Sequence, residues 1–417
     1  MKLKEWGGRG DYITGLDIGT SSLRVVVAEC RGSRPVIVYA KEDHSFGIRK
    51  GAVIDLGEAS QAINHALAEV KKISKAALKN IYVSIGTPQA KLQTSRGIVA
   101  VSRADAEIYQ DDIDRAVRAS RAVNLPQNRM IIHTLVREFM VDGVGDIIDP
   151  LGLSGSRLEV QSLIIDAFSP HVKTLIRAVE LAGGDVSGLV YGPIAATYAA
   201  LSKRQRDLGT ALVDIGFGTT GLCVYEENRL VGVAKFPVGA GNLSNDLAVG
   251  LKIPVDAAEE VKLHYGYAYS KEVPQKESVD LKKFSDDAKG AVSRKFIAEI
   301  VESRLEEIFD LANAELKLME RYGQLPGGVV LVGGGAKLPG LTELVKQEMK
   351  LSAQIGFTLT DEWEENGSGF KEYLEDPEFV GAFGLVLWGL EAEGKRGIEK
   401  PPSGGGGIKK FIGYFTP

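Results

Sequence analysis

The most constraining feature of this chain is a duplicated strand-turn-strand pattern whose two copies lie about two hundred residues apart. Each copy is an apolar run that ends in aspartate, then a glycine-containing turn with hydroxyl residues, then a second apolar run. The first reads ITGLDIGTSSLRVVVAE and the second ALVDIGFGTTGLCVYEE. Their turn residues are Asp17, Gly19, Thr20 and Ser21 in the first copy and Asp214, Gly216, Gly218, Thr219 and Thr220 in the second.

These residue types suit an anion such as a nucleotide phosphate. Glycine has no Cβ, so its amide approaches a phosphate oxygen closely, and successive N–H groups at a turn form a concave anion site. Serine and threonine hydroxyls add donors, and an aspartate at a strand end suits a hydrated Mg²⁺ ion that bridges phosphates. Either copy alone is also compatible with an ordinary hairpin turn. Two copies that face each other predict a clamp on one nucleotide.

A third glycine-rich segment, GGVVLVGGGAKLPGLTELVKQEM, joins a buried strand to a helix. The strand is expected over Val329 to Val332, the break over Gly333 to Gly335, and the helix from about Leu341. Glycine-rich loops that enter a helix favour anions. The order DIGT, DIGFGTT and LVGGGAKLPG resembles the actin, Hsp70 and sugar-kinase superfamily. That resemblance implies two related lobes that close over ATP with Mg²⁺.

Within that superfamily the chain resembles the bacterial cell-division FtsA family. The passage IIHTLVREFMVDG and the later IIDPLGLSGSRLEVQSLII are similar to the extra subdomain of that family, and Phe236 to Gly266 is similar to its entry into the second lobe. No room remains for the substrate domain of an Hsp70. The resemblance implies an actin-like protein that polymerises on the inner face of the cytoplasmic membrane at the septum. It also implies tethering of the tubulin-like FtsZ and recruitment of later division proteins.

The fold implied is α/β, an actin-like two-lobed ATPase fold with an FtsA-type α+β insert subdomain in lobe one. Its expected parts are the lobe-one core, residues 12–86, 166–207 and 380–392; the insert, 87–165; the lobe-two core, 208–242 and 323–379; a helical subdomain, 243–322; a flexible linker, 393–407; and a tail, 408–417. Asn242, Ser244 or Asn245 is expected to cap the first helix of the helical subdomain. A helix with small residues over Phe379 to Leu390 is expected between the lobes, and Asp361 to Glu378 is expected to be a solvated acidic loop.

Carried over onto this sequence, the nucleotide site of the family comprises three groups of residues. Asp17 and Asp214 are expected to hold Mg²⁺ through water and to be the catalytic carboxylates. The expected ATP-binding residues are Gly19, Thr20, Ser21, Ser22, Gly216, Phe217, Gly218, Thr219, Thr220, Gly239, Glu259, Lys262, Gly334, Gly335 and Lys337. The helix with Glu259 and Lys262 is expected to reach the adenosine, and a solvated charged face is the alternative interpretation of its pattern.

One departure from hydrolytic relatives concerns turnover. In those relatives the segment matching YGPIAATYAAL carries Glu or Gln just before the proline, or nearby, to orient the attacking water. Here Gly192 precedes Pro193. We therefore expect nucleotide binding with slow or no hydrolysis. A steady-state assay that finds turnover near ~1 s⁻¹, the low end of typical enzyme rates, contradicts this expectation.

Composition argues against several other classes of protein. Fifty Lys and Arg against 55 Asp and Glu give a net charge of −5, which argues against nucleic acid as a main partner. No stretch reaches ~18 apolar residues and the N-terminus lacks an apolar signal core, so neither a membrane span nor secretion is expected. Cys30 and Cys223 fit small buried hydrophobes in a reducing cytoplasm, and the five histidines lack metal-ligand spacing.

The C-terminal segment has a composition of its own. After Leu390 the sequence becomes polar and rich in Pro and Gly, which is typical of a flexible linker, and it ends in an apolar segment. On a helix, one face is shared by Ile408, Phe411, Ile412 and Phe415, with Lys409 and Lys410 near the interface. This pattern predicts an amphipathic helix that binds the membrane surface weakly as one copy and strongly as many copies on a filament. The alternative is a disordered end with chance hydrophobic residues.

The resemblance also implies that the second-lobe helical region binds a short C-terminal peptide of FtsZ. Arg304 matches a family position there, and Arg294 and Lys295 lie a few turns earlier, where basic groups pair with acidic groups of the peptide. Arg294 and Lys295 are also compatible with surface salt bridges. Two alternative functions remain: a pilus-assembly actin-like protein, which binds a membrane protein's cytoplasmic peptide, and a small-molecule kinase of the same superfamily, which needs a general base and a substrate pocket.

Overall fold

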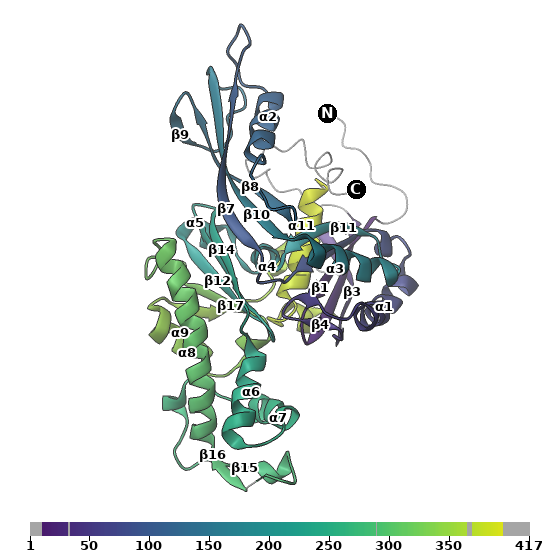
Figure 1. The fold of residues 1–417 in the computed structure, drawn as a ribbon, viewed down its shortest axis with the longest axis vertical. Coiled ribbons are helices and arrows are strands. Elements are labelled where there is room, and N and C mark those ends of the chain that lie inside the picture. The colour runs from purple at the N-terminus through teal and green to yellow at the C-terminus, as the bar shows by residue number, and fades with distance from the viewer. Residues whose placement is uncertain (1–10, 32–33, 289, 365–368, 395–417) are drawn as a thin grey trace.

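The computed structural model describes residues 11–31, 34–288, 290–364 and 369–394 of the chain. In these residues the chain forms two lobes, each built on a five-stranded sheet, with an inserted four-stranded domain and a helical extension at opposite ends of the molecule (Figure 1). The two-lobed α/β organisation expected from the sequence is therefore present.

The two large sheets repeat one strand order, β11-β6-β1-β2-β3 in lobe one and β18-β17-β12-β13-β14 in lobe two. In each sheet the first three strands of that order are parallel and the rest are antiparallel. Their bounds are Asp11–Ile18 (β1), Ser22–Arg31 (β2), Arg34–His44 (β3), Ile81–Ile85 (β6), Val186–Tyr191 (β11), Thr210–Ile215 (β12), Thr220–Glu226 (β13), Arg229–Phe236 (β14), Val329–Val332 (β17) and Ala353–Ile355 (β18). Asp17 pairs with Arg24 and Asp214 with Gly221, so the two aspartates occupy equivalent registers.

Side chains of β2 alternate between two apolar layers, which is why lobe one has helices on both faces of its sheet. Val25 and Val27 pack beneath α1 (Leu56–Ile73) and α3 (Ser169–Leu181), whereas Val26 and Ala28 face the opposite layer. Helix α1 begins after Asp55, whose carboxylate accepts a hydrogen bond from the backbone N–H of Glu58.

Helices α4 (Gly192–Ala200) and α11 (Val380–Ala392) lie between the two sheets and join the lobes (Figure 1). They share one core with Val26 of β2 in lobe one and with Leu212 and Cys223 of β12 and β13 in lobe two. The two helices pack backbone against backbone, because a Cβ added to Gly384 would lie 1.8 Å from the carbonyl oxygen of Ala195. The small residues of α11 therefore permit the close approach that the sequence predicts.

We expect the Gly384→Ala variant to lose about 1–3 kcal/mol of folding free energy or more, because the added methyl meets a backbone oxygen that cannot rotate away. Thermal melting of the variant measures the loss. The matched control is Gly57→Ala on the surface of α1, where an added Cβ would lie 3.3 Å from Oδ1 of Asp55. Alanine in a helix is favoured over glycine by up to about 1 kcal/mol. An unchanged melting temperature for Gly384→Ala contradicts this packing.

One apolar core joins the lobe-two sheet to four helices: α6 (Ala240–Leu251), α7 (Val255–Tyr265), α8 (Arg294–Leu318) and α9 (Leu341–Met349). Helix α9 lies beside the sheet, α8 runs from the sheet into the helical extension, and α6 and α7 lie in that extension (Figure 1). The expected cap of α6 is wrong. Helix α6 begins at Ala240, with Gly239 at the cap position, and the Asn242 side chain accepts a hydrogen bond from the Gly239 N–H at 3.1 Å. The glycine amide thus determines where the helix starts.

The inserted domain is a sheet in the order β7-β10-β8-β9 packed on one helix, α2 (Gln110–Ser120). Its strands are Lys91–Ala100 (β7), Arg129–Val141 (β8), Val144–Ile147 (β9) and Arg157–Phe168 (β10). His133 of β8 joins this domain to lobe one, because its Nε2 accepts a hydrogen bond from the N–H of Tyr191 at 2.9 Å. Burial lowers the pKa of His133 to about 4, which keeps the acceptor neutral.

The remaining elements are short. They are Ile48–Arg49 (β4), Ala52–Val53 (β5), Ser278–Asp280 (β15), Ala291–Ser293 (β16), Lys203–Leu208 (α5), Lys371–Leu374 (α10) and the 3₁₀ helices Ala77–Lys79 (η1), Ser270–Glu272 (η2), Leu281–Lys283 (η3), Gly334–Lys337 (η4) and Thr360–Glu362 (η5). In the described part of the chain no helix combines the length and apolar character that crossing a bilayer requires.

The acidic segment before α11 is not the solvated loop expected from its composition. Trp363 is buried and its ring packs 5.1 Å from that of Phe383, between ring centroids. Glu378 is partly buried and forms ion pairs with Arg24 of β2 and Lys337 of η4. The segment therefore belongs to the junction between the lobes.

Candidate functional site

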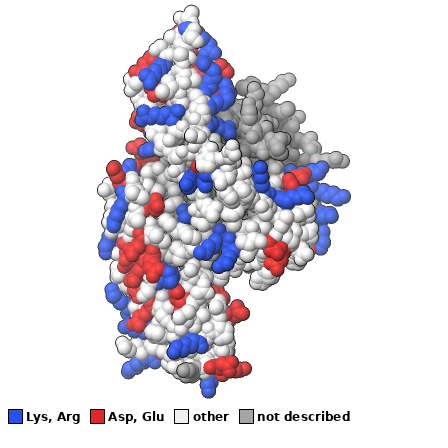
Figure 2. Space-filling model, in the orientation of Figure 1, with Lys and Arg blue, Asp and Glu red and all other residues white. Residues whose placement is uncertain are grey.

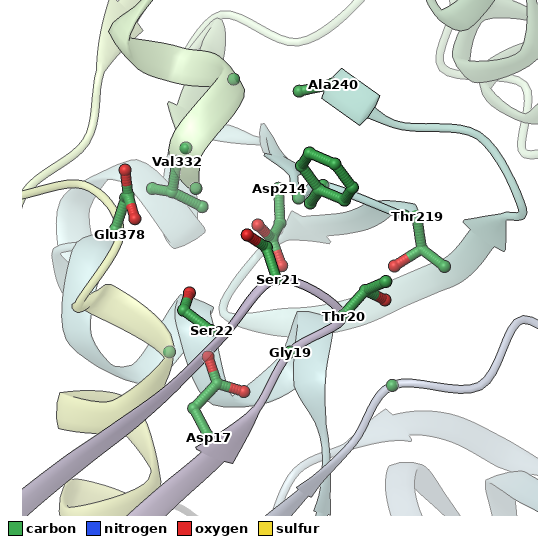
Figure 3. Close-up of a pocket in the computed structure, with 18 of the residues that line it drawn as sticks. Asp17, Gly19, Thr20, Ser21, Ser22, Asp214, Thr219, Ala240, Val332 and Glu378 are labelled. Carbon is green, nitrogen blue, oxygen red and sulfur yellow. The ribbon is translucent and has the colours of Figure 1, made fainter. Parts of the chain in front are cut away.

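A cleft of about 480 Å³ opens between the lobes and is lined by both aspartates, both glycine turns and the third glycine-rich segment (Figure 3). Small-molecule sites are commonly about 300–1,000 Å³. The sequence-predicted residues in its lining are Asp17, Gly19, Thr20, Ser21, Ser22, Asp214, Gly216, Phe217, Gly218, Thr219, Glu259, Lys262, Gly334, Gly335 and Lys337. Thr220 and Gly239 are absent from the lining and instead support the second turn.

The two turns have the same local hydrogen bond and meet across the cleft. The N–H of Gly19 donates to the carbonyl of Ser22 at 3.0 Å, and that of Gly216 donates to the carbonyl of Thr219 at 3.0 Å. A Cβ on Gly218 would lie 2.7 Å from Oγ1 of Thr20, so the turns of opposite lobes are in contact. Figure 3 shows Thr20 and Ser21 of the first turn close to Asp214, at the end of β12, and to Thr219 of the second turn.

The start of α6 fixes the second turn. The N–H of Ala240 donates to the carbonyl of Gly216 at 2.8 Å, and the Thr220 hydroxyl donates to the carbonyl of Val238 at 2.9 Å. A Cβ on Gly239 would lie 2.4 Å from the oxygen of Gly216, so only glycine permits this approach. Thr220 and Gly239 thus act on the shape of the turn.

The environments of the two aspartates differ. Asp17 accepts a hydrogen bond from Ser84 at 2.5 Å, between Oγ and Oδ1. Asp214 lies against the third glycine-rich segment, because a Cβ on Gly333, whose φ is +82°, would lie 2.4 Å from its Oδ1. Burial raises the pKa of Asp214, which Lys235 opposes and Asp17 reinforces. A cation beside Asp214 would favour its ionised form.

The predicted adenosine-side pair is joined by a direct ion pair on α7. Lys262 Nζ lies 2.7 Å from Glu259 Oε2 and 3.1 Å from Ser244 Oγ, and it stands 5.6 Å from the ring centroid of Phe217. Lys262 is only 5% exposed, so a solvated charged face does not describe it. The ion pair and the Phe217 ring hold this lysine at the edge of the cleft.

The cleft also contains four residues that the sequence interpretation missed: Arg24, Ser84, Lys235 and Glu378. Glu378 bridges Arg24 and Lys337, and the Lys337 ammonium also lies 2.8 Å from Asp376. Burial opposes ionisation of Glu378, but Arg24 and Lys337 prevail and lower its pKa. No sequence pattern points to Glu378, because its partner Arg24 is distant along the chain and the contact exists only once the lobes fold.

The three basic residues predicted to bind FtsZ do not form one patch. Arg304 donates to both carboxylate oxygens of Asp246, at 2.6 and 3.0 Å, and also pairs with Glu307. Arg294 pairs with Glu277 at 2.7 Å, which is the salt bridge of the alternative interpretation. Lys295 and Arg304 lie about 180° apart around α8, nine positions along a helix of 3.6 residues per turn.

The predicted membrane-binding residues, Ile408 to Phe415, lie outside the described residues, as does most of the predicted linker.

Comparison with known proteins shows the family to which the chain belongs. A family model described as cell division protein FtsA matches residues 211–384. A cell division protein FtsA of Borreliella burgdorferi is 34% identical over 94% of this chain and 94% of its own length. The chain belongs to the FtsA family. The FtsA of Bacillus subtilis is 31% identical over 89% of this chain and 82% of its own, and that of Escherichia coli is 28% identical over 93% of each.

As an FtsA-family member, the chain is a cell division protein, and its inserted domain has a family model of its own. The SHS2 domain inserted in FtsA matches residues 88–166. The insert itself is confirmed, whereas the boundaries 87–165 and those of the other parts stay predictions.

Solved structures confirm the actin-like fold of this FtsA-family chain. A chain of the PilM-PilN type IV pilus biogenesis complex aligns with a TM-score of 0.66 at 20% identity, covering 91% of this chain and 98% of that one. MreB5 of Spiroplasma citri bound to ADP aligns with a TM-score of 0.56 at 14% identity, covering 93% and 98%. At these identities the likeness extends to the fold alone.

The actin-like FtsA fold implies a bound nucleotide, generally with Mg²⁺, and the residues present fit both. A Cβ on Gly218 would contact Thr20, and a Cβ on Gly333 would contact Asp214. Because both residues are glycine, this space stays open and a phosphate can approach the backbone closely. The two carboxylates match Mg²⁺, which takes one or two from the protein and the rest from phosphates and water. Among the described residues no group of three or more His, Cys, Asp or Glu is arranged as a metal site.

Proposed function

We propose that this chain is an ATP-binding division protein that polymerises on the inner face of the cytoplasmic membrane at the septum and tethers FtsZ filaments there. The observation that carries the nucleotide part is the pair of equivalent glycine turns that meet at Thr20 and Gly218. Amides of both turns and the hydroxyls of Thr20, Ser21 and Thr219 supply donors to phosphates from opposite sides. A ligand held by both lobes favours the closed arrangement of the lobes.

Different sides of the cleft are proposed to bind different parts of the nucleotide. Asp17 and Asp214 hold Mg²⁺ through water, and the ion supplies charge neutralisation between phosphates. Glu259 and Lys262 reach the adenosine from α7, and the η4 segment with Gly334 and Gly335 closes the remaining side. Lys337 is tied to Asp376 and Glu378 and acts there by fixing η4.

Slow or absent ATP hydrolysis is expected from the residue that starts α4. Gly192 offers no carboxylate or carboxamide to orient a water. A small-molecule kinase needs a general base near the terminal phosphate, and Gly192 does not supply one, so this feature favours a nucleotide-dependent scaffold over a kinase. A phosphate-transfer screen separates the two.

Filament formation at a membrane tests the proposal as a whole. Electron microscopy of the full chain on a lipid monolayer is expected to show filaments with Mg²⁺ and ATP, and none when nucleotide is omitted. A pull-down with the C-terminal peptide of FtsZ distinguishes the division scaffold from a pilus-assembly protein. Absence of filaments under every nucleotide condition, or binding of a pilus membrane-protein peptide in place of the FtsZ peptide, contradicts the proposal.

The FtsZ peptide is proposed to bind on the α6 side of α8, near Arg304. Acidic side chains gather over α8 and α9 in Figure 2. Repulsion from Glu348, Glu302 and Asp310 adds to burial in raising the pKa of Glu306 of α8. That face repels an acidic peptide. Arg304 lies about 200° around α8 from Glu306, on the other side of the helix.

We expect Arg304→Gln to weaken binding of the FtsZ peptide about tenfold, because a charge-assisted hydrogen bond is lost. A fluorescence titration measures it. Arg321→Gln is the matched control, because Arg321 is also 27% exposed and binds Glu226 as Arg304 binds Asp246. Undiminished binding by Arg304→Gln removes Arg304 from the site.

A further inference from the structure

Lys235 lies on β14, on the face of the lobe-two sheet that is directed toward lobe one. It pairs with Gly221 across β13 and β14, and Gly221 pairs with Asp214 across β12 and β13. The three residues are thus direct neighbours on adjacent strands and point to the same face of the sheet. Gly221 has no side chain, and a Cβ there would lie 2.7 Å from Pro193 of α4. These three residues therefore lie along the contact between the lobes.

The Lys235 side chain reaches across the cleft to backbone of the other lobe. Its Nζ lies 3.6 Å from the position of a Cβ on Gly192 and 3.8 Å from that of a Cβ on Gly86. Gly192 starts α4 and Gly86 follows β6, so both belong to lobe one. The ammonium of Lys235 thus lies beside the start of α4, where Gly192 supplies no side chain.

Its charge faces the two aspartates without a direct ion pair. Asp214 and Asp17 both act on Lys235 electrostatically, yet within the described part of the chain no hydrogen bond or ion pair of its ammonium is present. Three N–H donors therefore remain for another group. A partly buried ammonium that lines the cleft without a protein partner suits an anion, because an ion in that cleft can accept charge-assisted hydrogen bonds from it.

The position of Lys235 within the cleft indicates which phosphate of a bound nucleotide it would contact. Lys262 and Glu259 lie beside Phe217 at one end, and the two glycine turns occupy the middle. Lys235 instead lies beside Gly86 and Gly192 and interacts electrostatically with both aspartates. A nucleotide with its adenosine at the α7 end therefore places its last phosphate nearest Lys235.

We propose that Lys235 binds the terminal phosphate of a nucleoside triphosphate and makes the cleft prefer the triphosphate to the diphosphate. The inference rests on the proposed nucleotide function. A diphosphate leaves the ammonium without this partner, whereas the triphosphate satisfies its donors. An ammonium has no lone pair to accept a proton from water, so Lys235 holds the phosphate without activating a nucleophile.

Binding of ATP and of ADP, each with excess Mg²⁺, to the full chain by titration calorimetry tests the proposal. We expect Lys235→Met to weaken ATP binding by about 10- to 100-fold, as loss of a charge-assisted contact does, and to change ADP binding by less than about threefold. Lys235→Arg, which keeps the charge, should retain most of the preference. Lys173→Met, on the exposed surface of α3, is the control and should change neither.

The outcomes separate this inference from the function on which it rests. Wild-type protein that binds neither nucleotide overturns the nucleotide function. Wild-type protein that binds both, with a Lys235→Met variant whose ATP-to-ADP affinity ratio is unchanged, overturns the role of Lys235 alone. Equal losses for ATP and ADP also overturn it, because they indicate damage to the whole cleft. Melting curves without nucleotide show whether each variant is folded, and Lys235→Gln replaces Lys235→Met if that variant is not.

Discussion

Gly218→Val is expected to lose at least about 100-fold in affinity for ATP with Mg²⁺, a loss of about 2.8 kcal/mol. A Cβ at this position already lies 2.7 Å from Oγ1 and 3.1 Å from Cβ of Thr20 in the opposite lobe. The two further methyl groups of valine occupy the space between the turns where the phosphates are proposed to lie. The turns must then separate, and both sets of amide donors move away from one ligand. Titration calorimetry measures the loss.

Two controls distinguish loss of the site from loss of the fold. Gly369→Val places the same side chain where no atom lies within 4 Å of an added Cβ, and it should bind ATP like the wild type. The Gly218→Val protein should melt near the wild-type temperature without nucleotide, because its close neighbours are side-chain atoms of Thr20 and no buried core is disturbed. Wild-type affinity in Gly218→Val would show that the nucleotide lies elsewhere.

Deletion of residues 408–417 should abolish co-sedimentation with anionic liposomes while ATP binding stays at the wild-type level. Four apolar side chains contribute at most ~1.5–3 kcal/mol each when fully buried, and each lysine adds roughly 1 kcal/mol on an anionic leaflet. These terms suffice for weak binding of one copy and for strong binding of a filament that presents many copies. Sedimentation should therefore increase with polymerisation.

Point variants separate the two contributions to membrane binding, which are burial of apolar side chains and attraction of the lysines to anionic lipid. Phe411→Ala combined with Phe415→Ala should lower sedimentation on neutral and anionic liposomes alike, since it removes apolar area. Lys409→Gln combined with Lys410→Gln should lower it only on anionic liposomes, and high salt should reproduce that loss. Unchanged sedimentation after deletion of the whole segment refutes the membrane proposal.

The parts of the site that the sequence predicts are those built by local chemistry. Asp17 with Gly19, and Asp214 with Gly216, lie in turns whose hydrogen bonds close within three residues, so glycine, aspartate and the flanking apolar runs suffice to predict them. Repetition of the pattern predicts a clamp on one nucleotide, and the family resemblance implies the two related lobes. The wrong expectations concern the start of α6 and the acidic segment around Trp363, where a backbone cap and a tertiary contact override local preference.

The sequence by itself determined the two glycine turns and the glycine-rich break before η4, because each is encoded in a short run of neighbouring residues. The actin-like fold was implied by the resemblance to the FtsA family and is confirmed by the comparisons. Three contacts were decided only by the tertiary structure. Ser84 donates a hydrogen bond to Asp17, and Glu378 bridges Arg24 and Lys337. The ammonium of Lys235 lies close to Gly192. Those contacts join residues from separate strands and separate lobes. Their geometry depends on how two sheets pack around α4 and α11, and no local spacing in the chain records it.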